Sequence, residues 1–147
     1  MDVVDRATRS RMMAGIRSKN TRPELQLRSI LHRAGFRYRL HSSRLPGRPD
    51  LVLARFRAVI LVHGCFWHGH SCPQFRWPKS NSEFWKVKIS ANKERDRRTV
   101  AQLMSLGWRV CVVWECVLRG RDGEANRILE LVSAWLPSDR EFLEIGK

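Results

Sequence analysis

The stretch AVILVHGCFWHGHSC, residues 58–72, joins a buried strand to a cluster of reactive side chains. Its first five residues form a short apolar run, and such a run bounded by glycine is typical of a strand inside a sheet. The ten residues from His63 to Cys72 contain two cysteines, three histidines, a phenylalanine and a tryptophan. These side chains can bind a metal, transfer a proton and present two large rings. Reactive groups at a strand end indicate an active site.

The segments around this stretch predict further strands. Residues 51–53 indicate a second buried strand, and Arg55 to Arg57 make a connection short enough for a hairpin. Residues 36–40 alternate apolar and basic side chains, as an edge strand does, and the SSRLPGRP segment after them is a loop. Residues 108–115 predict another buried strand.

A helix is predicted to begin near Thr21, which is a candidate cap. Pro23 lies in the first turn, and Glu24 follows the cap by three residues, as in a capping box. Gly35 ends the helix. The apolar stripe that it is expected to bury consists of Leu25, Leu27, Ile30 and Leu31.

Two more helices complete the expected order α, β-β-β, α, β, α. The first runs from a Ser82 cap to about Met104, and the second covers residues 124–135 and stops at Pro137. This order predicts an α/β fold, a central mixed sheet of about four strands flanked by helices.

The length of 147 residues predicts one domain. We expect this domain to cover residues 21–137, between a basic N-terminal arm at residues 1–20 and a C-terminal tail at residues 138–147. No stretch of 18 apolar residues exists and the N-terminus is polar, so neither a membrane span nor a signal peptide is expected. The protein is expected to be soluble and cytoplasmic.

The charge of the chain is strongly positive and uneven. The formal net charge is +14, and residues 1–57 carry 14 basic side chains against 4 acidic ones. Such an excess favours a polyanionic partner, because each neutralised phosphate releases condensed counterions. A solvated basic surface without a partner is the alternative, and charge alone does not exclude it.

Cys65, His70 and Cys72 lie in one short loop, and Cys116 follows the last predicted strand. Three thiolates and one imidazole form a closed tetrahedral set suited to structural zinc, whereas a catalytic zinc would keep one position for water. Core packing is the alternative for Cys116. Cys111 lies inside an apolar strand and is expected to be a small buried hydrophobe.

Asp50 stands in PGRPDLVL at the entrance to a buried strand. A carboxylate there is either a loop cap or a ligand of a hard cation. The predicted hairpin would bring Asp50 close to the backbone of Val62 and His63. A carboxylate and a main-chain carbonyl together suit Mg²⁺.

In these motifs the chain resembles the very short patch repair (Vsr) endonucleases, DNA-nicking enzymes of the restriction-endonuclease-like PD-(D/E)xK superfamily. The resemblance covers residues 7 to about 121 and runs through ATRSRMM, LPGRPDLVL, VILVHGCFWHGHSC, EFWKVKISANKERDRR and LGWRVCVVWECVLRG. It implies a Mg²⁺-dependent cut 5′ of the thymine in a G·T mismatch, which starts repair of deaminated 5-methylcytosine in the bacterial cytoplasm. One asymmetric mismatch needs one nick, so a monomer is expected.

The resemblance also implies roles for individual residues. Asp50 would hold the metal with the carbonyl of Val62, and His68 and His63 would act on water and on the phosphate. His68 is the favoured general base, although the two roles are exchangeable on sequence alone. Glu24 matches an acidic residue beside that site, but its capping-box position explains it equally well. One member of that family has threonine where this chain has Val62; a ligand supplied by the backbone carbonyl tolerates that change, whereas a hydroxyl ligand would be lost.

Three aromatic residues match rings that the family inserts beside the mismatch: Phe66, Trp67 and Trp85. Packing on the sheet is the alternative for Trp85. Lys88 and Asn92 share one helix face and would read base edges of the wobble pair, unless that face is simply solvated. Met13 in the N-terminal arm would approach from the minor groove.

The leading hypothesis is a Mg²⁺-dependent mismatch endonuclease with a structural zinc. A restriction- or junction-type nuclease of the same fold without mismatch preference is the second hypothesis. The third is a non-catalytic, zinc-stabilised DNA-binding protein, which is disfavoured because Asp50, His63 and His68 are all present. A zinc-catalysed hydrolase is a weaker fourth.

Overall fold

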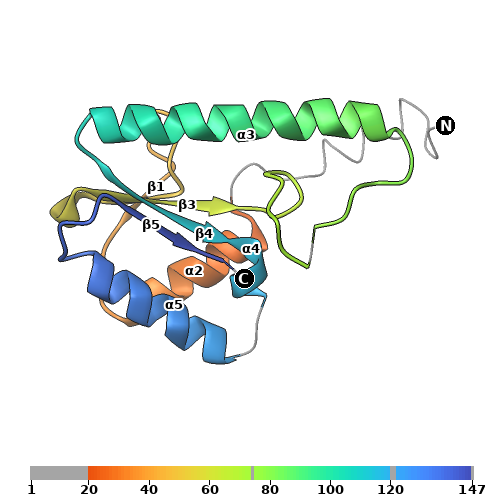
Figure 1. Cartoon of the computed structure of the whole chain (residues 1–147). Coiled ribbons are helices and arrows are strands. Elements are labelled where there is room, and N and C mark those ends of the chain that lie inside the picture. Colours follow the sequence, from red (N-terminus) through yellow and green to blue (C-terminus); the bar gives the residue numbers. More distant parts are fainter. Residues whose placement is uncertain (1–19, 74, 120–121, 147) are drawn as a thin grey trace.

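The computed structural model describes residues 20–73, 75–119 and 122–146, which form a five-stranded sheet with helices on both faces (Figure 1). The strands, in their spatial order, are β1 (Arg39–Leu40), β2 (Leu51–Leu53), β3 (Ala58–His63), β4 (Arg109–Trp114) and β5 (Phe142–Ile145). Neighbours from β1 to β3 are antiparallel, and neighbours from β3 to β5 are parallel. The predicted mixed α/β class is confirmed, with five strands instead of about four.

The helices make the sheet the middle layer of three. They are α2 (Arg22–Arg33), α3 (Ser82–Ser105), α4 (Glu115–Leu118) and α5 (Asp122–Trp135). Figure 1 shows α3 along one face of the sheet and α2, α4 and α5 gathered on the other. Within the described part of the chain, no helix is both long enough and apolar enough to cross a membrane.

The predicted hairpin of β2 and β3 is present. Leu51 pairs with Ile60, both side chains are fully buried, and a short 3-10 turn, η1 (Ala54–Phe56), connects the strands. Since β2 begins at Leu51, the residue before it, Asp50, lies beside the C-terminal half of β3. The hairpin therefore brings Asp50 to the strand end that carries His63.

The start of α2 agrees with the predicted cap, but its buried stripe differs. The hydroxyl of Thr21 accepts a hydrogen bond from the backbone N–H of Glu24 (3.4 Å). Leu25 was expected in the core and is 46% exposed, whereas Glu24 is 1% exposed. Glu24, Leu27 and Leu31 follow the spacing of one helix face, so the buried stripe begins with a carboxylate. This position aims an acid from the helix toward Asp50.

The long helix α3 begins at Ser82, which is its first residue and not its cap. Asn81 precedes the helix in the left-handed conformation (φ 58°) and makes no side-chain cap hydrogen bond. Few side chains of α3 are buried, Ile89 and Leu103 among them. Most of this helix is therefore available for contacts outside the core.

Two glycines let loops dock against α3. Gly47 (φ 72°) lies against Thr99, and Gly69 (φ 64°) lies against Lys93. A Cβ on either glycine would overlap with these side chains, and the positive φ also favours glycine. Both the loop before Asp50 and the loop after His63 are thus fixed to one helix.

Residues 138–147, expected as a tail, contain the fifth strand. β5 adds to the edge of the sheet beside β4, and its Ile145 is buried. The guanidinium of Arg109 in β4 supports this edge, because it donates hydrogen bonds to the carbonyls of Phe56 (2.8 Å) and Trp135 (3.1 Å). The segment is therefore part of the fold.

Candidate active site and metal centre

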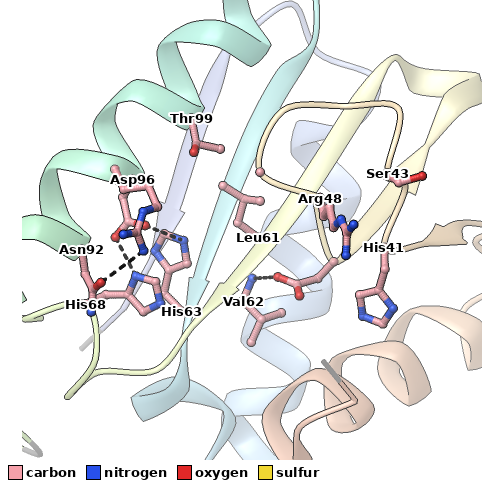
Figure 2. A pocket seen from close by; sticks show the side chains of 13 residues that line it. His41, Ser43, Arg48, Leu61, Val62, His63, His68, Asn92, Asp96 and Thr99 are labelled. Atoms are coloured by element: carbon pink, nitrogen blue, oxygen red, sulfur yellow. Dashed lines mark hydrogen bonds and ion pairs between the residues drawn. The ribbon is translucent and has the colours of Figure 1, made fainter. Parts of the chain in front are cut away.

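A pocket of about 550 Å³ opens beside the end of β3, between the sheet and α3 (Figure 2). Two groups of side chains face each other across it. His41 and Asp50 come from the two ends of the loop between β1 and β2, and His63, His68 and Asp96 come from the end of β3, the following loop and α3. The structure thus collects in one pocket the three residues that the sequence placed at the catalytic centre, together with two that it did not.

Asp50 and Val62 meet as predicted. The Oδ2 atom of Asp50 accepts a hydrogen bond from the backbone N–H of Val62 at 2.7 Å. In an extended strand the N–H and C=O of one residue face the same neighbour, so the carbonyl of Val62 faces the side of Asp50. A carboxylate and a carbonyl on one side of a strand fit a hard cation such as Mg²⁺.

Glu24 reaches the same site from α2. Its Oε1 lies 2.8 Å from Nε2 of His41, while its Oε2 binds the guanidinium of Arg28 and accepts the backbone N–H of Asn20 (3.2 Å). Thr21 therefore caps the helix at Glu24, as one of the two predictions for this residue has it, while the carboxylate of Glu24 contacts His41 of the pocket.

The two carboxyl groups of the site differ in acidity. Burial raises the pKa of Asp50 to about 8, and the charge of Glu24 acts in the same direction. Burial also acts upward on the pKa of Glu24, but hydrogen bonds from His41 and Asp50 and the charge of Arg28 bring it below its usual value. Without a cation, Glu24 is therefore the stronger acid of the pair.

His63 and His68 are stacked face to face, with ring centroids 4.0 Å apart and planes within 3°. Nδ1 of His68 is 2.6 Å from Oδ2 of Asp96, and Nε2 of His63 is 4.0 Å from Oδ1 of the same carboxylate. Because an ionised carboxylate only accepts hydrogen bonds, Nδ1 of His68 carries a hydrogen, and the lone pair of a neutral ring is then on Nε2. His68 is thereby oriented as a proton acceptor.

The burial of His63 separates its chemistry from that of His68. Burial lowers the pKa of His63 to about 3, the electrostatic interaction with the neighbouring His68 acts in the same direction, and Asp96 acts against it. His63 therefore stays neutral at physiological pH. A neutral imidazole of this kind can donate or accept a hydrogen bond but takes up a proton poorly.

The predicted zinc ligands Cys65, His70, Cys72 and Cys116 also come together, with their donor atoms within 4.8 Å of one another. Nδ1 of His70 lies 3.6 Å from Sγ of Cys65 and 3.7 Å from Sγ of Cys116. A tetrahedral zinc with bonds of about 2.3 Å to sulfur and about 2.0 Å to nitrogen separates such atoms by about 3.5 Å. The donor set therefore fits zinc. Cys111 is fully buried in β4, as expected of a core residue.

The C-terminal strand supports this cluster. The ring of His70 stacks on Trp114 at a centroid distance of 4.1 Å and an angle of 7°. The indole N–H of Trp114 donates to Glu144 of β5 at 2.8 Å. One side of the cluster is therefore held by the strand that the sequence analysis missed.

Phe66, Trp67 and Trp85 form one cluster of half-buried rings at the start of α3. Trp85 lies with its ring centroid 5.3 Å from that of Phe66 and 5.7 Å from that of Trp67. Phe75 extends the cluster (6.0 Å from Phe66), and Phe84 packs on Trp85 (5.0 Å) while remaining 37% exposed. The rings are thus gathered close to the surface.

The remaining predicted contacts are placed differently. Asn92 donates its side-chain N–H to the carbonyl of Trp67 (2.8 Å) and so anchors the loop of the cysteine and histidine cluster to α3. Lys88 is half-buried on the same helix. Met13 lies outside the described residues, together with the arm at residues 1–19.

His41 and Asp96 line the pocket and were missed from the sequence, as was Arg28, which binds Glu24 beside it. Asp96 lies four residues after Asn92 and therefore on the same face of α3, which was the available signal. His41 lies in a loop without a recognisable motif, and Arg28 reads as one of many basic residues. Only the fold shows that they converge.

Comparison with known proteins adds to this geometry. Residues 1–74 match the family model described as DNA mismatch endonuclease Vsr. DNA mismatch endonuclease Vsr of Escherichia coli (strain K12) is 47% identical over 136 residues, which cover 92% of this chain and 87% of that protein. Type II nicking enzyme V.XorIIP of Xanthomonas oryzae is 54% identical over 107 residues (73% and 79%), and type II nicking enzyme V.NmeAIP of Neisseria meningitidis is 44% identical over 131 residues (89% and 94%).

These relatives define the class of protein that carries the pocket: the chain is a DNA endonuclease, an enzyme that hydrolyses phosphodiester bonds. The part that matches the family model includes Asp50, His63 and His68. The chain belongs to the Vsr family of DNA mismatch endonucleases.

Proposed function

We propose that this endonuclease nicks one strand of DNA 5′ of the thymine in a G·T mismatch, with Mg²⁺, and so starts very short patch repair of deaminated 5-methylcytosine. One observation carries this proposal. A single pocket sets the oxygens of Asp50 and Val62 opposite His68, whose Nδ1 is held by Asp96. We further propose a cytoplasmic monomer with a restriction-endonuclease-like PD-(D/E)xK core.

Asp50 and the carbonyl of Val62 would hold the Mg²⁺. Bound there, the cation would activate a water molecule and neutralise charge that develops on the phosphate. Glu24 supports this position from α2, because Arg28 and Asn20 fix one of its oxygens. The net charge of +14 favours the approach of the DNA backbone.

His68 is the general base of this proposal and His63 its neutral partner. Nδ1 of His68 is hydrogen-bonded to Asp96, so in the neutral ring Nε2 is the atom that would accept a proton from water. His63, with a pKa lowered to about 3 mainly by burial, is suited to orient the phosphate or the water by a hydrogen bond. The exchange of roles that the sequence left open is therefore disfavoured.

Asp96→Asn is expected to slow single-turnover nicking by about a hundredfold, because an amide neither fixes the tautomer of His68 nor stabilises its protonated form. Asp96 is a positioning residue, so the dissociation constant for DNA should change by about twofold or less. The matched control is Glu94→Gln on the same helix, whose carboxylate pairs with exposed Arg97 and which should leave the rate unchanged. Equal rates for Asp96→Asn and the unaltered protein would contradict the role.

The aromatic cluster supports recognition of a mismatch. Phe66, Trp67 and Trp85 contact one another beside the exposed ring of Phe84. Rings near the surface can insert between stacked bases, and the free energy needed to unstack the bases is lowest where their base pairing is already weak. Lys88 and Asn92 on the same helix remain candidates for contacts with base edges, with Asn92 also holding the loop.

Trp85→Ala is expected to reduce nicking of a G·T duplex by about tenfold or more, since base stacking on an aromatic ring contributes about 1–3 kcal/mol. Its melting temperature should change little because the ring is only half-buried. Trp77→Ala is the matched control, since this 48% exposed ring contacts Phe75 and lies outside the trio. A Trp85→Ala protein that loses stability but keeps full activity would support sheet or loop packing instead.

The decisive experiment is strand-specific nicking of labelled duplexes that carry either a G·T mismatch or a matched G·C pair, in Mg²⁺ and in several flanking sequences. The expected product is a single cut 5′ of the mismatched thymine. Equal cutting of both duplexes would favour the restriction- or junction-type nuclease. Binding without cutting in any divalent metal would favour a non-catalytic DNA-binding protein.

We also propose that Cys65, His70, Cys72 and Cys116 hold a structural Zn²⁺. Four protein ligands leave no position for water, so the metal would have no direct part in hydrolysis. It would instead fix the loop that carries His68 and the aromatic cluster. This assignment disfavours the zinc-catalysed hydrolase.

A further inference from the structure

His41 occupies a position in the pocket that the nuclease proposal leaves without a role. Its ring nitrogen Nε2 lies 2.8 Å from Oε1 and 3.0 Å from Oε2 of Glu24. The potential ligand atoms of Glu24, His41 and Asp50 all lie within 4.8 Å of one another. Three donors, one from α2 and two from opposite ends of the loop between β1 and β2, thus converge beside the proposed cation.

The backbone of His41 is tied to the same acid. Its N–H donates a hydrogen bond to the carbonyl of Asp50 at 3.3 Å. The imidazole is only 17% exposed, so the ring is held inside the pocket. Figure 2 shows this ring on the side of Val62, across the pocket from His63 and His68. The ring is therefore fixed relative to Asp50 by both its main chain and its side chain.

Glu24 is oriented so that one oxygen faces this convergence. Arg28 and the N–H of Asn20 both bind Oε2. Oε1 lies closest to the imidazole of His41. The basic partners thus hold the carboxylate from one side and direct its other oxygen toward His41 and Asp50.

We propose that His41 is a nitrogen ligand of the divalent cation held by Asp50, and that the site consequently prefers Mn²⁺ to Mg²⁺. A carboxylate and an imidazole nitrogen face each other here at hydrogen-bonding distance, and in the metal-free protein a hydrogen atom lies between them. A cation can replace that hydrogen and bind Oε1, Nε2 and Asp50 together. The inference rests on the proposed function in one respect, since it requires a cation at Asp50.

The preference follows from the donor set. Mg²⁺ demands oxygen ligands and loses its water reluctantly, whereas imidazole suits the transition metals, and Mn²⁺ accepts both oxygen and nitrogen. A site made only of Asp50 and a carbonyl would not distinguish the two ions in this way. The nitrogen of His41 is therefore the feature that sets the metal preference.

The test is electron spin echo envelope modulation of Mn²⁺ bound to the full-length protein with its zinc in place, because this method detects a directly bonded ¹⁴N. The unaltered protein should show ¹⁴N modulation, and His41→Gln should lose it. His68→Ala is the matched control, since it removes the imidazole across the pocket, and it should keep the modulation. Circular dichroism checks that each variant is folded.

Equilibrium binding supplies an independent measurement. His41→Gln should weaken Mn²⁺ binding by about tenfold or more and Mg²⁺ binding by about twofold or less. Binding of Mn²⁺ that depends on Asp50 but lacks ¹⁴N modulation would overturn the role of His41 and leave the nuclease proposal intact. Modulation that disappears in His68→Ala and persists in His41→Gln would place the ion at the stacked histidines and also overturn it. Absence of any Asp50-dependent binding would overturn both proposals.

Discussion

Asp50→Asn is expected to lower the nicking rate by about a thousandfold or more, because it removes the charge that would hold the cation beside the phosphate. The amide oxygen can still accept the N–H of Val62, which now lies 2.7 Å from the carboxylate. The end of β3 should therefore keep its conformation, while the site loses the negative charge that would bind the cation. Single-turnover nicking of a G·T duplex in Mg²⁺ measures the effect.

The same variant should stabilise the metal-free pocket at high pH. Burial raises the pKa of Asp50 to about 8, so between about pH 4 and pH 8 the folded protein binds more protons at this group than the unfolded chain does. Its contribution to the free energy of unfolding consequently falls as pH rises through this window. Asp50→Asn removes this loss of stability. The difference in the free energy of unfolding between the variant and the unaltered protein should be largest at pH 8, about 1 kcal/mol or more, and should vanish near pH 4.

Asp139→Asn is the matched control, because Asp139 is exposed and distant from the pocket. It should change neither the rate nor the dependence of stability on pH. If Asp50→Asn nicked as fast as this control, the cation would have to lie elsewhere, and the active-site assignment would be wrong.

Cys116→Ser is expected to abolish zinc binding and to destabilise the protein by about 3 kcal/mol or more, because binding of a structural metal contributes directly to folding. Cys116 follows β4 directly, and its sulfur lies 3.7 Å from Nδ1 of His70 in the loop after β3. The metal would thus join the segment that follows β4 to the loop that carries His68. Zinc content by mass spectrometry and thermal unfolding measure the two effects.

Cys111→Ala is the matched control for this change. Cys111 is also fully buried, in β4, but it lies outside the cluster of four donors. The Cys111→Ala protein should lose only about 1 kcal/mol in its free energy of unfolding and should still bind one zinc ion. A Cys116→Ser protein with unchanged zinc content would contradict the ligand set, and loss of activity before unfolding on chelation would favour a catalytic zinc.

Much of the fold followed from local patterns in the sequence. The hairpin of β2 and β3 was predicted because an apolar run that is buried on both faces has few other places in a domain. Thr21 and Pro23 marked the start of α2 for reasons of local hydrogen bonding. Both signals act over a few residues, which is why they can be recognised without knowing the fold.

Other elements depend on the whole fold. β5 lies in a segment rich in charge, SDREFLEIGK, which carries little apolar alternation. It becomes a strand because β4 offers a free edge and because Arg109 binds the carbonyls nearby. Leu25 was expected in the core because it is apolar, yet the face of α2 that meets the pocket requires Glu24.

Some residues of the candidate site could likewise be predicted from local sequence, and others could not. Asp50, His63 and His68 lie in motifs close to the central strand and could be predicted together. His41 and Asp96 contribute one side chain each from segments 9 residues before Asp50 and 28 residues after His68. No motif marks His41, and the one signal for Asp96 is that it shares a helix face with Asn92. Such residues become visible only when the distances between segments are known.

One face of α3 fixes the distance between the aromatic cluster and the pocket. Trp85 and Asp96 are eleven residues apart, which brings them to the same side of the helix at a separation of about 16 Å along its axis. A continuous helix of three turns neither stretches nor rotates, so the span from the ring cluster to the carboxylate that orients His68 is constant. On the proposed mechanism, the distance from the inserted aromatic rings therefore determines which phosphodiester bond is cleaved, and every nicked strand ends at the same nucleotide.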